Sequence, residues 1–126
     1  FRSRDANDGS LGRARAIVVL EQLLSMVAPT RTALLPVYPN PFNPETWVPF
    51  DLRDEANVTV SIYDASGRRV RHIELGRRSP GSYRTRDKAA YWDGRTDTGE
   101  VTASGVYFVE LAVGLYRETR RIVMLK

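Results

Sequence analysis

The sequence predicts an all-β protein, an antiparallel β-sandwich of about seven strands that is preceded by one N-terminal amphipathic α-helix. Three observations carry this prediction. Apolar and polar side chains alternate in several short segments after residue 46, which is the period of a strand with one buried face. Turn residues separate these segments at short, regular spacings. Prolines at 39, 41, 44 and 49 mark a boundary that neither a helix nor a central strand can cross.

The composition limits the class of protein. The 126 residues, of which 42% are hydrophobic, suffice for one ordinary domain with a real core plus an appendage. The absence of cysteine excludes disulfides and thiolate metal sites. Nineteen basic and fifteen acidic residues give a net charge of +4, but both signs are interspersed, which favours a solvated surface over nucleic-acid binding. Because the first residue is Phe1, we expect a fragment or a processed product.

The N-terminal part predicts a helix that meets another surface. Residues 1–10 are polar and indicate a flexible segment. Residues 11–28 carry apolar side chains on two neighbouring helical stripes, and Pro29 ends the helix. Its longest apolar run is far shorter than the roughly 20 residues of a membrane span. Because the apolar face is wider than a small sandwich would cover, we expect contact with an upstream passenger domain of the same protein or self-association through residues 11–28. Residues 29–37 form a connector.

The proline-rich segment at residues 38–50 opens the sandwich, which we expect to occupy residues 38–126. Its prolines favour an extended chain. Asn40 and Asn43 are expected to form local Asx turns. This segment therefore delivers the chain into a first strand at residues 47–52.

The next two strands form a hairpin. Alternation predicts that one face of the second strand is buried, and its apolar residues are Val58, Val60 and Ile62. Asp64-Ala65-Ser66-Gly67 is typical of a tight turn. The third strand, residues 68–75, changes parity midway, which predicts a β-bulge near Arg71 and His72.

Three further segments complete the predicted sandwich. Residues 83–92 are expected to form one extended segment whose apolar tail, 89–92, lies in the core. The strand at 106–113 alternates and should bury one face. The last strand, 116–126, contains an apolar run at 122–125 that predicts burial on both faces.

Several short motifs occur in a fixed order along the chain. They are Asn40-Pro41-Phe42-Asn43-Pro44-Glu45-Thr46, Ile62-Tyr63-Asp64 with Gly67-Arg68, Trp92-Asp93-Gly94, Gly99, Ser104-Gly105-Val106-Tyr107-Phe108 and the terminal Lys126. Together they resemble the C-terminal sorting domains (type A) of type IX secretion cargo. They are also similar to the immunoglobulin-like module named after the flagellar hook-capping protein. The resemblance covers about residues 36–126 and leaves the predicted helix outside.

The resemblance implies an immunoglobulin-like β-sandwich that is a non-catalytic sorting and anchoring domain of a larger secreted protein. Such domains are recognised by an outer-membrane secretion apparatus after passage through the periplasm of a diderm bacterium, and many are cut off or exchanged for a cell-surface anchor. The implied partners are secretion machinery proteins and the upstream passenger domain. The last strand carries the candidate recognition residues, which should line one exposed or edge region: Arg117, Arg120, Arg121 and Lys126.

This chain departs from the sorting-domain pattern in two respects. Arginines stand where lysines are frequent, and the Trp-Asp-Gly loop resembles the hook-capping version. The alternative function is a structural immunoglobulin-like module that packs against neighbours in an adhesin, a fibre or a multidomain enzyme.

The residues predict neither catalysis nor a cofactor. His72 is the only histidine, which argues against a Ser/His/Asp site or a histidine metal site. Asp93, Asp97 and Glu100 could hold calcium, but capping of backbone amides explains them better. Aromatic side chains could form a sugar or base platform, but so small a sandwich needs most of them in its core; they are Tyr83, Tyr91, Trp92, Tyr107 and Phe108. We therefore expect no enzyme activity and no bound cofactor, metal or nucleic acid.

Overall fold

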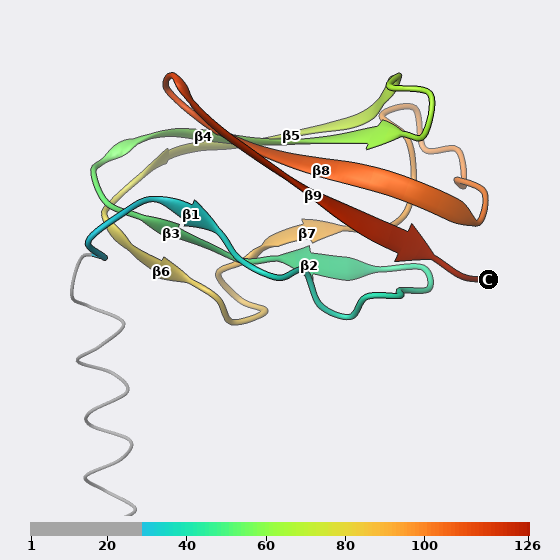
Figure 1. Ribbon diagram of the computed structural model, residues 1–126, viewed down its shortest axis with the longest axis horizontal. Helices are drawn as coiled ribbons and strands as arrows, with labels where there is room; N and C mark the ends of the chain where they lie inside the picture. Colours follow the sequence, from blue (N-terminus) through green and yellow to red (C-terminus); the bar gives the residue numbers. More distant parts are fainter. Residues whose placement is uncertain (1–28) are drawn as a thin grey trace, which may run out of the picture.

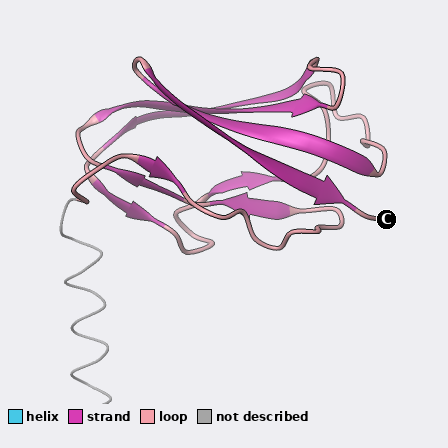
Figure 2. Cartoon of the chain, viewed as in Figure 1, coloured by secondary structure: helices cyan, strands magenta, loops and turns pink. Residues whose placement is uncertain are grey.

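The computed structural model describes residues 29–126, and every regular element in this range is a β-strand (Figure 2). The predicted flexible segment 1–10 and helix 11–28 lie outside the described residues. No helix within residues 29–126 is long and apolar enough to cross a membrane. The prediction of an all-β fold is confirmed.

Two layers face each other across one hydrophobic core (Figure 1). The upper layer is a four-stranded antiparallel sheet in the order β5-β4-β8-β9. Its strands are β5 (Arg69–Arg78), β4 (Ala56–Asp64), β8 (Gly105–Val113) and β9 (Tyr116–Met124). The lower layer contains two smaller sheets, β1-β3-β6 and β2-β7. These strands are β1 (Ala33–Leu34), β2 (Thr46–Val48), β3 (Phe50–Leu52), β6 (Gly81–Tyr83) and β7 (Ala90–Trp92).

Alternation of apolar residues builds the centre of the upper layer, as predicted. Val60 is paired with Leu111 and Ile62 with Val109, so their side chains share the inner face. All four are fully buried. Because side chains on a strand point alternately to opposite faces, the polar residues between them lie on the outer face.

The predicted first strand at residues 47–52 is divided at Pro49. β2 pairs with β7, whereas β3 pairs with β1 and β6. Proline has no N–H to donate to a ladder, and the carbonyl oxygen of Pro49 accepts a hydrogen bond from the Leu35 N–H at 3.0 Å. The division therefore falls where the ladder lacks a donor.

The expectation of one extended segment at residues 83–92 was wrong. β6 and β7 are separated by a turn in which the carbonyl oxygen of Thr85 accepts hydrogen bonds from the N–H groups of Lys88 and Ala89, at 2.9 and 2.7 Å. Tyr91, which was expected in the core, is 44% exposed. It lies on the outer face because Ala90 and Trp92 on either side of it are buried.

One β-bulge of β5, at Val70, confirms the bulge predicted near Arg71, and a second bulge lies at Leu75. Register shifts leave Leu75 and Val70 without a direct partner on β4, whereas His72 pairs regularly with Ser61. Each extra residue resets the parity of the strand. Val70 is therefore buried and Ile73 packs against the core, although they are three residues apart.

The last strand is buried on one face only, which corrects the prediction for residues 122–125. Ile122 and Met124 are fully buried, whereas Val123 is half-buried and Leu125 is 55% exposed. An antiparallel sandwich packs one face of each sheet on the core and leaves the other to solvent. The apolar run therefore contains two residues of the inner face, Ile122 and Met124, and two that lie outside the core, Val123 and Leu125.

Candidate functional site

The proline-rich segment joins the two layers of the sandwich. Tyr38 forms an antiparallel bridge with Trp47 in the lower layer, through N–H···O distances of 3.0 and 2.8 Å. Phe42 forms a parallel bridge beside β9: its N–H donates to the Val123 carbonyl at 2.9 Å, and its carbonyl accepts from Leu125 N–H at 3.0 Å. Figure 1 shows β9 descending from the upper layer toward this segment. The segment is thus part of the fold and not merely a lead-in.

The asparagines of this segment do not form the local turns that we expected. Asn40 Oδ1 accepts a hydrogen bond from the backbone N–H of Val123 at 3.0 Å, so it caps the distant strand β9. The Asn43 side chain is exposed and makes no hydrogen bond within residues 29–126. The peptide bonds before Pro39, Pro41 and Pro44 are cis.

The aromatic side chains of three motifs meet in the core. Trp92 is fully buried, and its ring centroid lies 5.4 Å from that of Phe42 and 5.6 Å from that of Tyr107. Its indole Nε1–H donates to the Arg95 carbonyl at 2.9 Å. The Tyr107 hydroxyl donates to the Ala103 carbonyl at 2.6 Å, which fixes the loop ahead of β8.

Gly94 is a glycine because the proline-rich segment passes directly over it. Its φ is +78°, and a Cβ atom there would lie 2.4 Å from the Pro44 carbonyl oxygen and 3.0 Å from Met124 Cε. Its own carbonyl oxygen accepts hydrogen bonds from the N–H and the hydroxyl of Thr102, at 3.1 and 2.7 Å. The loop, the proline-rich segment and the end of β9 are therefore packed into one unit. We call this unit the motif cluster, and its members are Phe42, Pro44, Trp92, Gly94, Thr102, Tyr107 and Met124.

Asp93 and Asp97 cap main-chain groups as predicted, whereas the prediction was wrong for Glu100, whose Oε1 accepts a hydrogen bond from the Thr98 hydroxyl at 3.3 Å. Asp93 Oδ1 accepts from the Arg95 N–H at 3.0 Å and from Arg71 Nη1 at 3.3 Å. Asp97 Oδ1 accepts from the N–H of His72 on β5 at 2.9 Å, and Gly99, with φ +90°, closes the turn. Within residues 29–126 no group of three or more histidine, cysteine or acidic side chains is arranged to hold a metal ion. Calcium independence stays a prediction.

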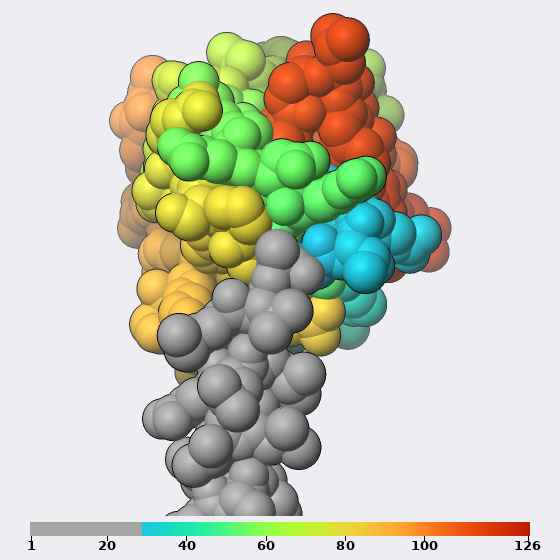
Figure 3. All heavy atoms as spheres, turned by 90° about the vertical axis from the view of Figure 1, so that its left-hand side faces the viewer, coloured from blue at the N-terminus to red at the C-terminus, as the bar shows by residue number. Residues whose placement is uncertain are grey.

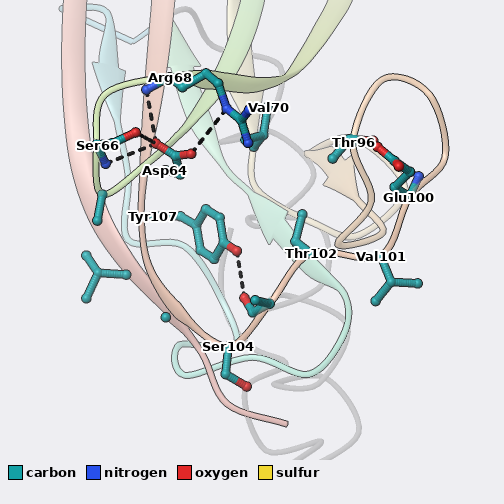
Figure 4. Close-up of a pocket in the computed structure, with 14 residues that line it drawn as sticks. Asp64, Ser66, Arg68, Val70, Thr96, Glu100, Val101, Thr102, Ser104 and Tyr107 are labelled. Atoms are coloured by element: carbon teal, nitrogen blue, oxygen red, sulfur yellow. Dashed lines mark hydrogen bonds and ion pairs between the residues drawn. The ribbon is translucent and has the colours of Figure 1, made fainter.

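A hollow of about 550 Å³ opens beside the motif cluster, between the turn at residues 64–68 and the loop at 96–107 (Figure 4). Asp64 Oδ1 accepts from the N–H and the hydroxyl of Ser66, at 3.0 and 2.6 Å, and from the Arg68 N–H at 3.0 Å. The Ser66 hydroxyl in particular, helped by these N–H groups and the Arg68 charge, lowers the pKa of Asp64. The carboxylate is thus engaged in its own turn, which fits a structural role. Ser104, at the rim, accepts the Lys126 N–H on its hydroxyl oxygen at 3.0 Å, and Gly105 follows with φ +154°.

The four candidate recognition residues do not form one patch. β9 is an edge strand, as expected, and Arg117 and Arg121 are exposed on its outer face. Arg120 is half-buried on the inner side, where its Nε donates to the Leu34 carbonyl at 3.1 Å. Lys126 is exposed beyond the end of the strand. Arg117 and Arg121 therefore share a face, and Arg120 does not join them.

An aromatic group on the outer face of β2 and β7 was missed by the sequence analysis. The Trp47 ring centroid lies 6.4 Å from that of Tyr38 and 5.3 Å from that of Tyr91, and the Arg86 guanidinium carbon is 4.3 Å from it. The Tyr91 hydroxyl donates to Glu45 Oε1 at 2.6 Å. The available signal was parity: Trp47 is next to Val48, which is buried, so it belongs to the opposite face.

Comparison with known proteins identifies the fold. The family model of the FlgD Ig-like domain matches residues 45–114. No curated protein sequence matches the chain. Dimeric latent PorU from Porphyromonas gingivalis superposes with a TM-score of 0.56 at 18% identity over 79% of this chain and 10% of PorU. PorZ, described as an essential surface component of the type IX secretion system of that organism, gives 0.51 at 23% identity over 75% of this chain and 12% of PorZ. FlgD from P. aeruginosa gives 0.47 at 22% identity, covering 76% of this chain and 67% of FlgD.

This chain spans only about a tenth of the length of PorU and PorZ. At these identities the likeness shows a shared fold, which is an immunoglobulin-like β-sandwich.

Proposed function

The chain belongs to the family of FlgD Ig-like domains, and from this premise we propose that it is a non-catalytic sorting and anchoring domain of a larger secreted protein. A type IX-like secretion apparatus in the outer membrane recognises it, after passage through the periplasm of a diderm bacterium, and delivers its passenger to the cell surface. Its partners are the proteins of that apparatus and the passenger domain.

One observation carries the proposal: the motifs that resemble those of sorting domains meet in the motif cluster around β9. Phe42 bonds to the backbone of β9, Met124 reaches Gly94, and Ser104 holds the backbone of Lys126. The chain thereby fixes the geometry of its last strand and presents Arg117 and Arg121 on the exposed face of that strand. Fold likeness to PorU and PorZ supports the same reading at the level of architecture.

A structural immunoglobulin-like module is the second candidate. Two observations favour it: the matching family model ends at residue 114, before β9 begins, and an aromatic group lies on the outer face of β2 and β7. Such a surface suits packing against a neighbouring domain.

Surface display of a reporter separates the two functions. The reporter is fused ahead of the full chain and expressed in a host with a type IX apparatus, and surface exposure is followed by protease accessibility of intact cells. Removing residues 38–126 should abolish display. Full display after this deletion would contradict a sorting role and leave the structural module as the function.

Charge substitutions then test which residues are recognised. Arg121→Gln with Lys126→Gln removes two charges from exposed side chains, which typically changes stability by less than about 0.5 kcal/mol. The matched control, Arg53→Gln with Lys88→Gln, removes the same charge from exposed sites outside β9. We expect display to fall for the first pair alone, with both melting temperatures unchanged. Equal display of the two pairs would exclude Arg121 and Lys126 from recognition.

A further inference from the structure

The outer edge of β9 has unpaired backbone groups in its middle. Along an edge strand of an antiparallel sheet, N–H and C=O groups point alternately to the neighbouring strand and to the open side. The N–H and C=O of Val123 point to the open side, because they bond to Asn40 Oδ1 and to the Phe42 N–H. By the same alternation, Arg117, Thr119 and Arg121 direct their groups to this side. No backbone group or side chain of residues 29–126 bonds to them there.

The structure holds this stretch, residues 117–121, in place beyond its C-terminal end and on its inner side. The proline-rich segment covers the edge beyond it. On the inner side, Glu118 Oε1 accepts the Leu34 N–H at 2.9 Å, and Arg120 Nε donates to the Leu34 carbonyl at 3.1 Å. A hollow of about 320 Å³ lies beside the stretch, between β9 and residues 36–40. Figure 3 shows the end of the sandwich where β1 (blue) lies below the tip of the β8–β9 hairpin (red). The open edge is therefore a preformed, extended template.

The charges on this edge select what can pair with it. Arg117 and Arg121 flank Thr119 on the outer face and are exposed. The one acidic residue of the stretch, Glu118, points inward and is engaged by the Tyr116 hydroxyl as well as by Leu34. In a symmetric antiparallel pairing of two copies centred on Thr119, Arg117 of each copy would oppose Arg121 of the other. Like charges directly opposite are destabilising, so a second copy is disfavoured and an acidic strand is favoured.

We propose that the open edge at residues 117–121 accepts an extended, acidic segment of a partner protein as an additional β-strand. Backbone hydrogen bonds to Arg117, Thr119 and Arg121 provide the register, and Asp or Glu side chains four residues apart on the added strand lie opposite the two arginines. The inference deepens the proposed function and rests on it only for the partner's place in the secretion apparatus. The pairing itself is a property of this chain.

Arginine on an edge has a second explanation, because natural sheets use charged edge residues to prevent aggregation. Arginines that only protect the edge would attract an acidic peptide equally well whether or not that peptide can form backbone hydrogen bonds. The two explanations therefore differ in whether binding needs both the charge and the backbone N–H groups of the added strand.

The test uses the full chain and three synthetic peptides at low ionic strength. The first peptide alternates Glu and Thr, the second has Lys in place of Glu, and the third is the first with its edge-facing amides N-methylated. Calorimetry measures the affinities, and amide hydrogen exchange by NMR reports on Arg117, Thr119 and Arg121. We expect the Glu peptide to bind at least about tenfold more tightly than the Lys peptide, because two favourable cross-strand charge pairs become repulsive. It should also bind at least about tenfold more tightly than the N-methylated peptide, which keeps the charges but cannot donate backbone hydrogen bonds to the edge. The three amides should be protected on binding.

Two variants locate the binding on β9. Arg117→Glu with Arg121→Glu should invert the preference, so that the Lys peptide binds more tightly than the Glu peptide. The control, Arg69→Glu with Arg78→Glu, makes the same charge change on exposed residues of the other edge strand, β5, and should leave the preference unchanged. Melting temperatures of both variants confirm that each remains folded.

Three results would overturn the inference. They are equal affinity for the Glu and Lys peptides, equal affinity for the Glu and N-methylated peptides, and protection of the three amides by self-association without peptide. Binding without any effect of the domain on reporter display would contradict the proposed function and leave the edge site standing. If deletion of residues 38–126 abolishes display but the full chain binds no peptide, the proposed function stands and the edge site is contradicted.

Discussion

Replacing Gly94 by alanine tests the packing of the motif cluster. The added Cβ would lie 2.4 Å from the Pro44 carbonyl oxygen, which is main chain, and 3.0 Å from the Met124 methyl carbon. The φ of +78° adds about 1–2 kcal/mol for any residue with a side chain. Overpacking in a well-packed interior costs about 1–3 kcal/mol more. We therefore expect the free energy of unfolding to fall by roughly 2–5 kcal/mol.

Gly99→Ala is the matched control, because φ is +90° there and a Cβ would meet nothing within 4 Å. It should cost only the conformational share, about 1–2 kcal/mol. The difference in unfolding free energy between the two variants measures the cost of the close approach to Pro44. Each kcal/mol of this difference should lower the melting temperature of Gly94→Ala by a further ~4–8 °C for a domain of this size. Urea denaturation followed by tryptophan fluorescence measures both midpoints and slopes. Equal midpoints for the two variants would refute the packing of Gly94 against Pro44.

Truncation of Trp92 to alanine removes a fully buried ring and should cost about 3–5 kcal/mol of unfolding free energy; denaturation midpoints equal to those of the parent would contradict its place in the core. Because Asp93 and Asp97 accept main-chain hydrogen bonds, melting temperatures should agree in chelator and in millimolar calcium, and a shift of several degrees would show that calcium binds the native state. Burial, followed by the hydrogen bond to Glu118, raises the pKa of Tyr116 from 10.0 to about 12. Stability should therefore be intact below pH 10 and decline as the pH rises toward about 12, a loss that Tyr116→Phe should remove in denaturation measured across this range.

Structural features that depend on a few consecutive residues were predictable from the sequence. Val58, Val60 and Ile62 alternate, and a strand with one buried face must place all three in the core. The tight turn at Asp64-Ala65-Ser66-Gly67 was predicted for a similar reason: its glycine adopts φ +88°, and its first residue accepts the Gly67 N–H. Side-chain period and turn chemistry are properties of a few consecutive residues.

Contacts between distant segments were not predictable. Asn40 can satisfy its amide in a local turn or on a distant backbone N–H, and nothing near it in the sequence selects Val123, which lies 83 residues away. The turn after β6 contains neither glycine nor proline, so residues 83–92 appeared continuous. A change of parity in β5 showed that a bulge was needed, but the partner strand sets its position, at Val70 and Leu75. The motifs of the candidate site were visible individually, whereas their convergence is tertiary.

The bonds that tie β9 to the start of the sandwich have a consequence for the timing of folding. Leu34 and Asn40 find their partners on β9 only after more than eighty intervening residues. During synthesis β9 emerges after every other strand described here, and until then the core lacks Ile122 and Met124. Long-range pairings of this kind also form slowly, because the entropic cost of closing a long loop comes before the stabilising contacts form. Folding of the domain therefore cannot be completed before residue 124 has been made, because only then are the last strand of the larger sheet and two residues of the core available.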